Sequence, residues 1–323
     1  MGHGSSTVIE DSGEVSVIDG GPGDTLLNFL SHRGIRRIDS VLVSHADADH
    51  FGGISLLLSD PRYRVGHVYL NPDSRRTVLW DDFVSVMRAA QQRGTRFSLE
   101  LSSGNPGQLS VGASRLEVLA PSQQFAVRTT SGQTPGGQRL TPNAMSAVVR
   151  VWTGDSPRLL IAGDIDKVGL DQLVAHAEDA RAEVLVFPHH GGLPRRADPR
   201  DFAESLMRLV GAHLVVFSIG RARYRTPDPN IVSAILDAVP DVHIACTQLS
   251  RHCASERPQE RSSLHAGISR GAEARACCAG TMEVTLEPEN GYWPTRQAHL
   301  DFIRLNAPTA LCRRSRVPTT GST

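Results

Sequence analysis

Residues 45–50 of the chain hold four side chains that can bind a metal ion. The segment 44–53 reads Ser-His-Ala-Asp-Ala-Asp-His-Phe-Gly-Gly, and its candidate ligands are His45, Asp47, Asp49 and His50. In an extended or tightly turned backbone alternate side chains point to one side, which brings the first three together, and the adjacent histidine joins them where the chain bends. Carboxylates and imidazoles held in one small volume repel or desolvate each other unless a cation compensates them. We therefore interpret the segment as a divalent metal site; the alternative is a polar turn after a strand.

Three other segments place polar side chains at the end of an apolar run. Asp19 follows Val-Ser-Val-Ile, Asp164 follows Leu-Leu-Ile-Ala-Gly, and the pair His189-His190 follows Leu-Val-Phe-Pro. Alone, such an aspartate is more often a helix cap or turn residue, and a histidine pair is usually satisfied locally. Combined with the segment 45–50, they supply the remaining side chains of a metal site, and Asp19 is suited to orient a ligand.

The elements that must position these residues alternate between short β-branched runs and helical patterns. Expected strands are 14–19, 38–44, 65–70, 116–120, 144–152, 158–162, 184–188, 213–218 and 281–286. Expected helices are 25–32, 54–58, 82–93, 168–176, 199–210 and 230–239. The alternation predicts a layered α/β fold with mixed sheets.

The composition gives no sign of a strongly basic, a membrane-spanning or a disulfide-stabilised protein. With 34 basic and 34 acidic side chains among 323 residues, the formal net charge is zero, so any binding of a polyanion must be local. We find no apolar run of the roughly 20 residues that span a bilayer and no signal peptide, which predicts a cytoplasmic protein without a membrane partner. Five cysteines is an odd number, which favours free thiols or metal ligands over structural disulfides.

With these segments in this order, the chain resembles the metallo-β-lactamase superfamily, and more closely the hydrolase domain of ComEC-type competence proteins and their free-standing relatives. The resemblance covers residues 2–286. The motifs that carry it are Gly2-His-Gly-Ser-Ser6, Ile18-Asp-Gly-Gly21, Ser44 to Gly53, Asn143-Ala-Met-Ser146, Ala162-Gly-Asp164, Pro188-His-His-Gly191 and Ser218-Ile-Gly220. It implies an αββα sandwich, in which two mixed β-sheets are flanked by helices and the metal lies at one sheet edge.

The resemblance also implies a domain organisation. Residues 1–287 are predicted to form the hydrolase domain, with a Cys/His-containing insertion at 250–278. Residues 288–323 are predicted to be a C-terminal extension that offers a surface for protein partners and whose extreme end is disordered.

Carried over by position, the resemblance assigns His45, Asp47 and Asp164 to one metal subsite. The other subsite takes Asp49, His50, a shared Asp164 and one histidine of the pair. Alignment on the following glycine favours His190 as the ligand and leaves His189 to contact substrate or donate a proton.

The chain departs from the superfamily at positions that affect metal choice. Many members have a histidine where Asp47 stands and another where Asn143 stands, so this site is richer in oxygen. Oxygen-rich sites accept harder ions, which makes Mn²⁺ a candidate beside Zn²⁺, with one or two ions bound. Thr226-Pro227 stands where ComEC-like chains commonly have His-Pro, which removes a candidate general acid.

A site of this kind supports hydrolysis by metal-activated water, with Asp49 as the candidate base. The resemblance implies a phosphodiesterase or nuclease that acts on DNA, although a small nucleotide phosphodiester fits equally well. The alternatives are a non-catalytic metal-binding scaffold in a DNA-uptake or defence complex, and a lactonase or thioesterase type of hydrolase.

Arginines near the expected site are candidate ligands for phosphate. The predicted substrate-binding residues are Asn143, Arg195, Arg221, Arg223 and Tyr224. The alternative is a solvated rim, because arginine is abundant throughout the chain.

The sequence near the end of the fold is rich in cysteine. A structural zinc ion there would use ligands from the set Cys246, His252, Cys253, Cys277 and Cys278. Buried free thiols are the alternative.

Overall fold

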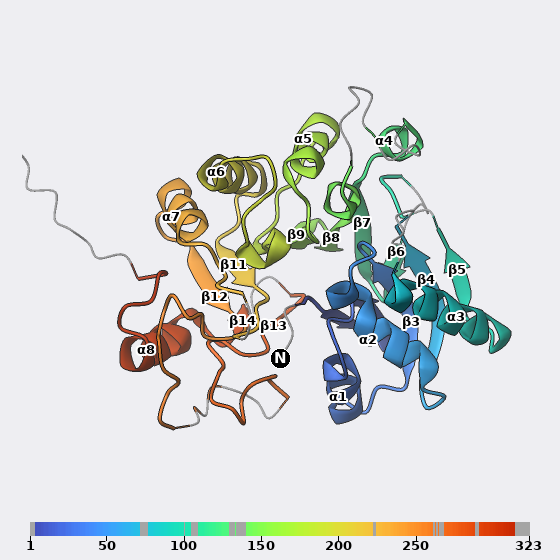
Figure 1. The fold of residues 1–323 in the computed structure, drawn as a ribbon, viewed down its shortest axis with the longest axis horizontal. Coiled ribbons are helices and arrows are strands. Elements are labelled where there is room, and N and C mark those ends of the chain that lie inside the picture. The colour runs from blue at the N-terminus through green and yellow to red at the C-terminus, as the bar shows by residue number, and fades with distance from the viewer. Residues whose placement is uncertain are drawn as a thin grey trace, which may run out of the picture.

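The computed structural model describes residues 4–71, 77–99, 101–104, 109–128, 133, 140–221, 224–260, 262, 264, 268–287 and 291–313. Within these residues the chain forms an αββα arrangement, in which two β-sheets stack and helices cover their outer faces (Figure 1). The predicted α/β sandwich with two mixed sheets is confirmed.

The first sheet has the strand order β1-β2-β3-β4-β5. Its strands are β1 (Thr7–Asp11), β2 (Glu14–Ile18), β3 (Arg37–Val43), β4 (Arg64–Leu70) and β5 (Arg96–Ser98). Only the β1–β2 pair is antiparallel, because the later strands are joined through α1 (Thr25–His32), α2 (Ala48–Ser59) and α3 (Val78–Gln92). Buried side chains such as Leu30, Ile54 and Phe83 fill the space between these helices and the sheet.

The second sheet has the order β12-β11-β10-β9-β8-β7-β6. Its strands are β6 (Leu109–Val111), β7 (Ser114–Ala120), β8 (Val148–Thr153), β9 (Ser156–Ile161), β10 (Val184–Val186), β11 (Leu214–Phe217) and β12 (His243–Cys246). The pairs from β6 to β9 are antiparallel and those from β9 to β12 are parallel. The sheet is accompanied by α4 (Gln123–Arg128), α5 (Lys167–His176), α6 (Pro199–Val210) and α7 (Pro229–Ala238).

The two sheets face each other across an apolar layer. Ile18 and Leu42 of the first sheet belong to the same buried group as Val149 and Ile161 of the second. Burial of such side chains stabilises each by about 1.5–3 kcal/mol relative to exposure, so this layer fixes one sheet against the other. The edges of the two sheets are therefore fixed relative to each other.

The predicted C-terminal extension is structured over its described part. β14 (Tyr292–Trp293) pairs with β13 (Glu283–Val284), and Thr295 caps α8 (Arg296–Asn306) through its side chain. Phe302 and Ile303 of this helix lie in the same buried core as α6 and α7. The predicted disorder of the extreme end falls on residues 314–323, which lie outside the described residues.

Two differences from the predicted elements affect the site. The expected strand 144–152 begins only at Val148, because Pro142 and the hydroxyl of Thr141, which accepts from the Ala144 amide, start a 3₁₀ helix over Pro142–Met145. The expected helix 54–58 begins earlier, at Ala48, which places Asp49 and His50 in its first turn.

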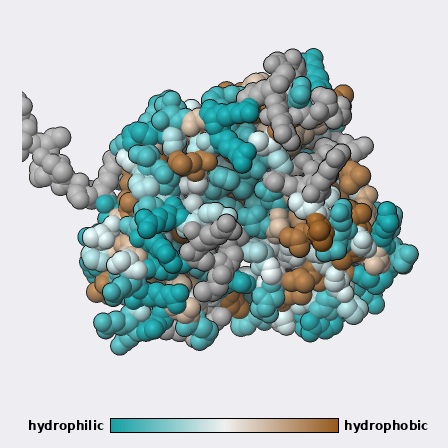
Figure 2. Space-filling model, in the orientation of Figure 1, coloured by the Kyte–Doolittle hydropathy of each residue, from teal (hydrophilic) through white to brown (hydrophobic). Residues whose placement is uncertain are grey.

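The surface in Figure 2 is mostly hydrophilic, and its hydrophobic residues gather on the side where α2 and α3 lie in Figure 1. Leu56 and Leu79 are among the exposed side chains of these helices. No helix in the described ranges has both the length and the apolarity needed to cross a membrane.

Candidate metal centre

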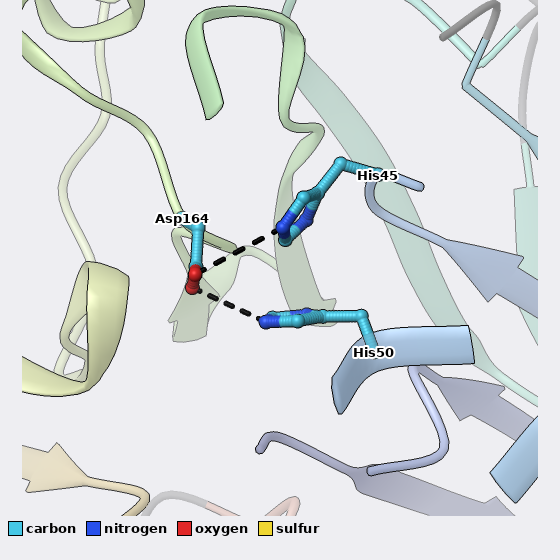
Figure 3. Close-up of side chains that lie close together, drawn as sticks. All are labelled: His45, His50 and Asp164. Atoms are coloured by element: carbon cyan, nitrogen blue, oxygen red, sulfur yellow. Dashed lines mark ion pairs between the residues drawn. The ribbon is translucent and has the colours of Figure 1, made fainter. Parts of the chain in front are cut away.

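The candidate ligands come from both sheets and meet at one edge. His45 lies just after β3, Asp49 and His50 lie at the start of α2, and Asp164 and His190 follow β9 and β10. Figure 3 shows the rings of His45 and His50 directed at the carboxylate of Asp164. The carboxyl ends of these strands therefore collect the residues that the sequence pattern singled out.

Asp164 is the carboxylate that faces most of the ligand nitrogens. Its Oδ1 lies 3.3 Å from Nε2 of His50 and 3.8 Å from Nε2 of His190, and its Oδ2 lies 3.9 Å from Nε2 of His45. Asp164 is 4% exposed, so these contacts are shielded from water. This carboxylate therefore faces nitrogens on both sides of the centre.

Two overlapping groups of candidate metal ligands occur among the described residues. One consists of His45, His50 and Asp164, and the other of Asp49, His50 and His190, with the ligand atoms of each group within 4.8 Å of one another. Asp49 Oδ2 lies 3.5 Å from His190 Nε2. The cluster could hold one or two divalent ions.

Asp47 completes the set of predicted ligands. It stands at the N-cap of α2, and its Oδ2 lies 3.6 Å from Nε2 of His45. Its side chain is more accessible than those of the histidines, at 25% exposure against 0% for His45. The structure thus brings all six predicted ligands to one place.

The histidine rings are oriented as metal ligands require. Nε2 of His45 and of His50 is buried and forms no hydrogen bond within the described part of the chain. Leaving a buried polar atom unpaired costs about 1–3 kcal/mol, which a coordinated ion would offset. Nδ1 of His190 donates to the carbonyl of Ser218 at 2.8 Å, which turns its Nε2 toward the other ligands. The donor set and its orientation therefore fit a divalent cation.

A buried network fixes the rings of His45 and His50 from behind. The carboxylate of Asp19 accepts from Nδ1 of His50, from the Ser44 amide and from the Ser44 hydroxyl, each at 2.7 Å. The Ser44 hydroxyl in turn lies 3.0 Å from Nδ1 of His45. Asp19 was predicted to orient a ligand. The role of Ser44 was not, because a serine after a strand has no distinctive sequence signal.

Close backbone packing holds α2 against the turn that carries Asp19. The Gly53 amide donates to the carbonyl of Gly21 at 2.7 Å, and a Cβ on Gly53 would overlap the carbonyl of Gly20. Only glycine allows this approach. The second glycine of Asp-His-Phe-Gly-Gly therefore serves to seat His50 over Asp19.

His189 and His190 lie in a strained turn. Their φ angles are 52° and 55°, in the left-handed region that costs a non-glycine residue about 1–2 kcal/mol. Gly191 continues the turn at φ 72°, where a Cβ would come within 2.6 Å of the Phe217 ring. Two consecutive left-handed histidines point their side chains to different places, which gives the pair two different environments.

His190 belongs to one of the two candidate ligand groups, and His189 lies beside it. The side chain of His190 is 4% exposed and that of His189 is 39% exposed. Nδ1 of His189 lies 3.2 Å from Oδ2 of Asp164 and 3.3 Å from the side-chain nitrogen of Asn143. Of the predicted substrate-binding residues, Asn143 is thus at the centre.

Charge and burial act in opposite directions on the acidic groups. Burial raises the pKa of Asp49, but the hydrogen bond from His190 and the charges of His50 and His190 lower it to about 2. Burial also raises the pKa of Asp164, but the charges of His50 and His190 lower it well below its usual range. Both carboxylates are ionised at neutral pH, the form that binds cations.

The pKa values of His50 and His189 are shifted upward, opposite to those of the carboxylates. Burial lowers the pKa of His50, but the carboxylates of Asp164 and Asp19 raise it well above its usual value. The hydrogen bond to Asp164 raises the pKa of His189 despite its burial. His189 is therefore suited to hold a proton near neutral pH.

The predicted contact of Arg221 with substrate at the metal centre needs correction, whereas those of Arg195, Arg223 and Tyr224 stay predictions. Arg221 is 9% exposed, and its terminal nitrogens donate to the carbonyls of Leu249, Ala254, Ser255 and Glu256, so its guanidinium organises the protein chain rather than facing the metal centre. Arg195 and Tyr224 are exposed. Arg223 lies outside the described residues.

The predicted structural zinc site does not form within the described residues. No three ligand atoms from the set Cys246, His252, Cys253, Cys277 and Cys278 come within 4.8 Å of one another. Their polar atoms are directed elsewhere: Cys277 Sγ donates to the Arg270 carbonyl, Cys278 Sγ lies 3.2 Å from Nε2 of His299, and His252 contacts the Arg225 carbonyl. Burial raises the pKa of Cys246 and Cys278 well above the usual range, as expected for buried free thiols.

Comparison with known proteins agrees with the fold. The family described as the metallo-beta-lactamase superfamily matches residues 1–206. ComE operon protein 3 of Bacillus subtilis (strain 168) is 27% identical over 172 residues, which are 51% of this chain and 19% of that protein. Competence protein ComA of Neisseria gonorrhoeae is 25% identical over 182 residues, which are 56% of this chain and 20% of that protein. The matched region thus spans about a fifth of the length of these relatives.

Solved structures with a related fold are more distant. Tm1679, a metal-dependent hydrolase of the beta-lactamase superfamily, is 17% identical with a TM-score of 0.45, covering 76% of this chain and 89% of that one. Igni18, a metallo hydrolase from Ignicoccus hospitalis, is 14% identical with a TM-score of 0.44, covering 76% and 91%.

Proposed function

The chain belongs to the metallo-beta-lactamase superfamily, and from this premise we propose that it is a metal-dependent phosphodiesterase or nuclease that hydrolyses DNA. The proposed metal ligands are His45, Asp47, Asp49, His50, Asp164 and His190. The observation that carries the proposal is the pair of ligand groups that overlap at His50, with the buried Nε2 atoms of His45 and His50 directed at the carboxylate of Asp164.

The ligand set favours the ions and the substrate class that the sequence indicated. Asp47, Asp49 and Asp164 supply carboxylate oxygens, so Mn²⁺ suits the centre as well as Zn²⁺. A bound divalent cation would lower the pKa of a water molecule and polarise the phosphoryl oxygen it touches. Asp164, which faces both groups, would serve both ions if two are bound. The oxygen-rich set and the relationship to competence proteins support a phosphodiester rather than a lactam or lactone.

Two side chains are proposed to act on the protons of the reaction, one as a hydrogen-bond acceptor for water and one as a general acid. Asp49 stays ionised at neutral pH and accepts a hydrogen bond from the attacking water, which orients it. His189 has a raised pKa, is held at Nδ1 by Asp164 and is partly exposed, so its Nε2 can donate a proton to the leaving oxygen. The side-chain amide of Asn143 lies 3.3 Å from the same Nδ1 atom.

The test is a substrate panel. Protein loaded with Zn²⁺ or Mn²⁺ is incubated with single- and double-stranded DNA, RNA, a cyclic dinucleotide and a bis-aryl phosphodiester. We expect cleavage of at least one, strongest for DNA, and its loss in Asp49→Ala. Asp81→Ala, which changes an acidic residue in the first turn of α3, is the matched control. Cleavage of none of these by metal-loaded protein would defeat the proposal, and hydrolysis of lactones or thioesters instead would favour the alternative class.

A further inference from the structure

Outside the metal centre, the described residues form a strongly basic pocket of about 710 Å³. Its charged lining consists of Arg221, Arg225, Arg251, Arg257 and Arg275 against a single carboxylate, Glu256. The chain as a whole has equal numbers of acidic and basic side chains, so this excess of positive charge is local. Concentrated guanidinium groups attract anions, and phosphates above all.

Arg221 builds the pocket, Arg257 and Arg275 each donate a hydrogen bond to a backbone carbonyl, and Arg225 and Arg251 are the guanidinium groups that we assign to a ligand. The buried guanidinium of Arg221 holds the segment 249–256 through four carbonyls. Arg225, Arg251, Arg257 and Arg275 are exposed, and none of them forms an ion pair with a carboxylate elsewhere in the described residues. A cluster of exposed guanidinium groups that form no ion pairs among the described residues creates a local positive potential that attracts anions.

The pocket is attached directly to the metal centre through the backbone. The segment 218–228 is tied at both ends to the turn that carries His190: Nδ1 of His190 donates to the carbonyl of Ser218 at 2.8 Å, and the Asp228 amide donates to the carbonyl of Gly191 at 2.8 Å. Arg221 and Arg225 lie between these two anchors. Since successive Cα atoms are about 3.8 Å apart, the Cα of Arg221 lies within about 11 Å of that of Ser218.

We infer that the pocket binds the backbone phosphates of a polynucleotide strand that continues from the metal centre, an inference that rests on the proposed phosphodiesterase function. A strand carries one phosphate for about every 3.4 Å of helix axis, so about three nucleotides bridge 11 Å. In this proposal the pocket favours a strand over a small phosphodiester, because a strand presents several phosphates and a small phosphodiester presents only one or two.

The test measures binding without chemistry. Fluorescently labelled single-stranded DNA and RNA of two, four and eight nucleotides are titrated with protein in the presence of a chelator, and anisotropy gives Kd at several salt concentrations. The wild-type affinity should rise with length up to about four nucleotides. In Arg225→Ala/Arg251→Ala the Kd for the eight-nucleotide strand should rise about tenfold. The slope of log K against log[salt] should become shallower by about 1.4, since each phosphate that an arginine no longer neutralises reduces it by about 0.7.

The matched control is Arg88→Ala/Arg304→Ala, which removes the same charge from exposed positions on α3 and α8. It should leave both the Kd and the salt slope at the wild-type values. Equal effects of the two double variants would show a general charge effect and overturn the inference, as would a pocket variant that binds like the wild type. Far-ultraviolet circular dichroism verifies that both variants fold.

The binding assay and the cleavage panel with metal-loaded protein together separate this inference from the proposed function. Failure of the wild type to cleave any phosphodiester, with strand binding still weakened in the pocket variant, would refute the enzyme and leave the binding site. Cleavage by the wild type without any dependence of binding on Arg225 and Arg251 would refute the binding site alone. The DNA and RNA arms show whether the 2′-hydroxyl matters to a pocket that reads phosphate.

Discussion

The change Asp19→Asn tests whether the metal centre depends on the residue behind its ligands. Asp19 has a φ of 58°, a backbone conformation that asparagine adopts readily, whereas alanine would add a strain of about 1–2 kcal/mol. The amide keeps the shape of the carboxylate but loses its charge and one acceptor oxygen. The substitution therefore isolates the hydrogen bonds from the backbone.

The size of the effect follows from what the carboxylate holds. Asp19 contacts Nδ1 of His50 directly and orients Nδ1 of His45 through the hydroxyl of Ser44. Loss of a partner of this kind lowers metal affinity typically about 10–100-fold, or about 1.4–2.7 kcal/mol. Because two ligands depend on Asp19, we expect a value near 100-fold.

The assay is competition for Zn²⁺ against a chromophoric chelator of known affinity. Asp19→Asn should bind the wild-type number of ions at saturation but with weakened affinity. The control is Asp39→Asn, which removes a carboxylate of β3 that accepts from the Val15 amide and from Arg37, away from the ligands. A wild-type affinity for Asp19→Asn, or equal weakening in both variants, would refute the reasoning.

Three further predictions follow from the same structure. Asp164→Ala should lose at least one ion by native mass spectrometry, because its carboxylate faces both ligand groups; an unchanged metal count contradicts this role. His189→Gln should keep its ions while kcat falls on the order of 10²–10⁴-fold, whereas His190→Gln should bind metal weakly; equal metal loss in both would contradict the assignment. Burial, together with the positive charges of nearby groups, lowers the pKa of His243 from 6.5 to about 3, so the unfolded chain takes up a proton between these pH values that the folded chain does not. Stability should therefore fall as the pH decreases from 6.5 toward 3, by about 1.4 kcal/mol per pH unit from this group, and urea unfolding of His243→Gln should show a shallower dependence; identical slopes would exclude a contribution from His243.

Much of the site could be predicted because its signal is local. The spacing of His45, Asp47, Asp49 and His50 is visible within six residues, and Asp164 and His190 stand at the ends of apolar runs that became β9 and β10. The carboxyl ends of parallel strands lie at the same edge of a sheet, and this does not depend on the conformation of the loops that connect them. The long apolar patterns gave the elements α1 and α6 with their observed bounds.

The parts that could not be predicted depend on contacts distant in the sequence. Arg221 lies in an arginine-rich run that resembles a solvated surface, and only the folded chain brings the carbonyls of 249–256 to its guanidinium. The strand β12 begins with a histidine, which hides its β pattern, and this His243 is buried because Tyr292 and His299 satisfy its nitrogens. The cysteines lie close in sequence but direct their sulphur atoms to different partners.

The origin of the ligands in two sheets has a consequence for assembly. His45, Asp49 and His50 belong to the N-terminal half of the fold, and Asp164 and His190 to the other half, so each ligand group draws on both. A fragment that contains one sheet would carry only part of a coordination sphere, and it would sequester a cation feebly however well it folded. The affinity for a divalent cation therefore also reports how firmly the two halves are packed together, because the complete ligand set exists only when the apolar layer between the sheets is formed.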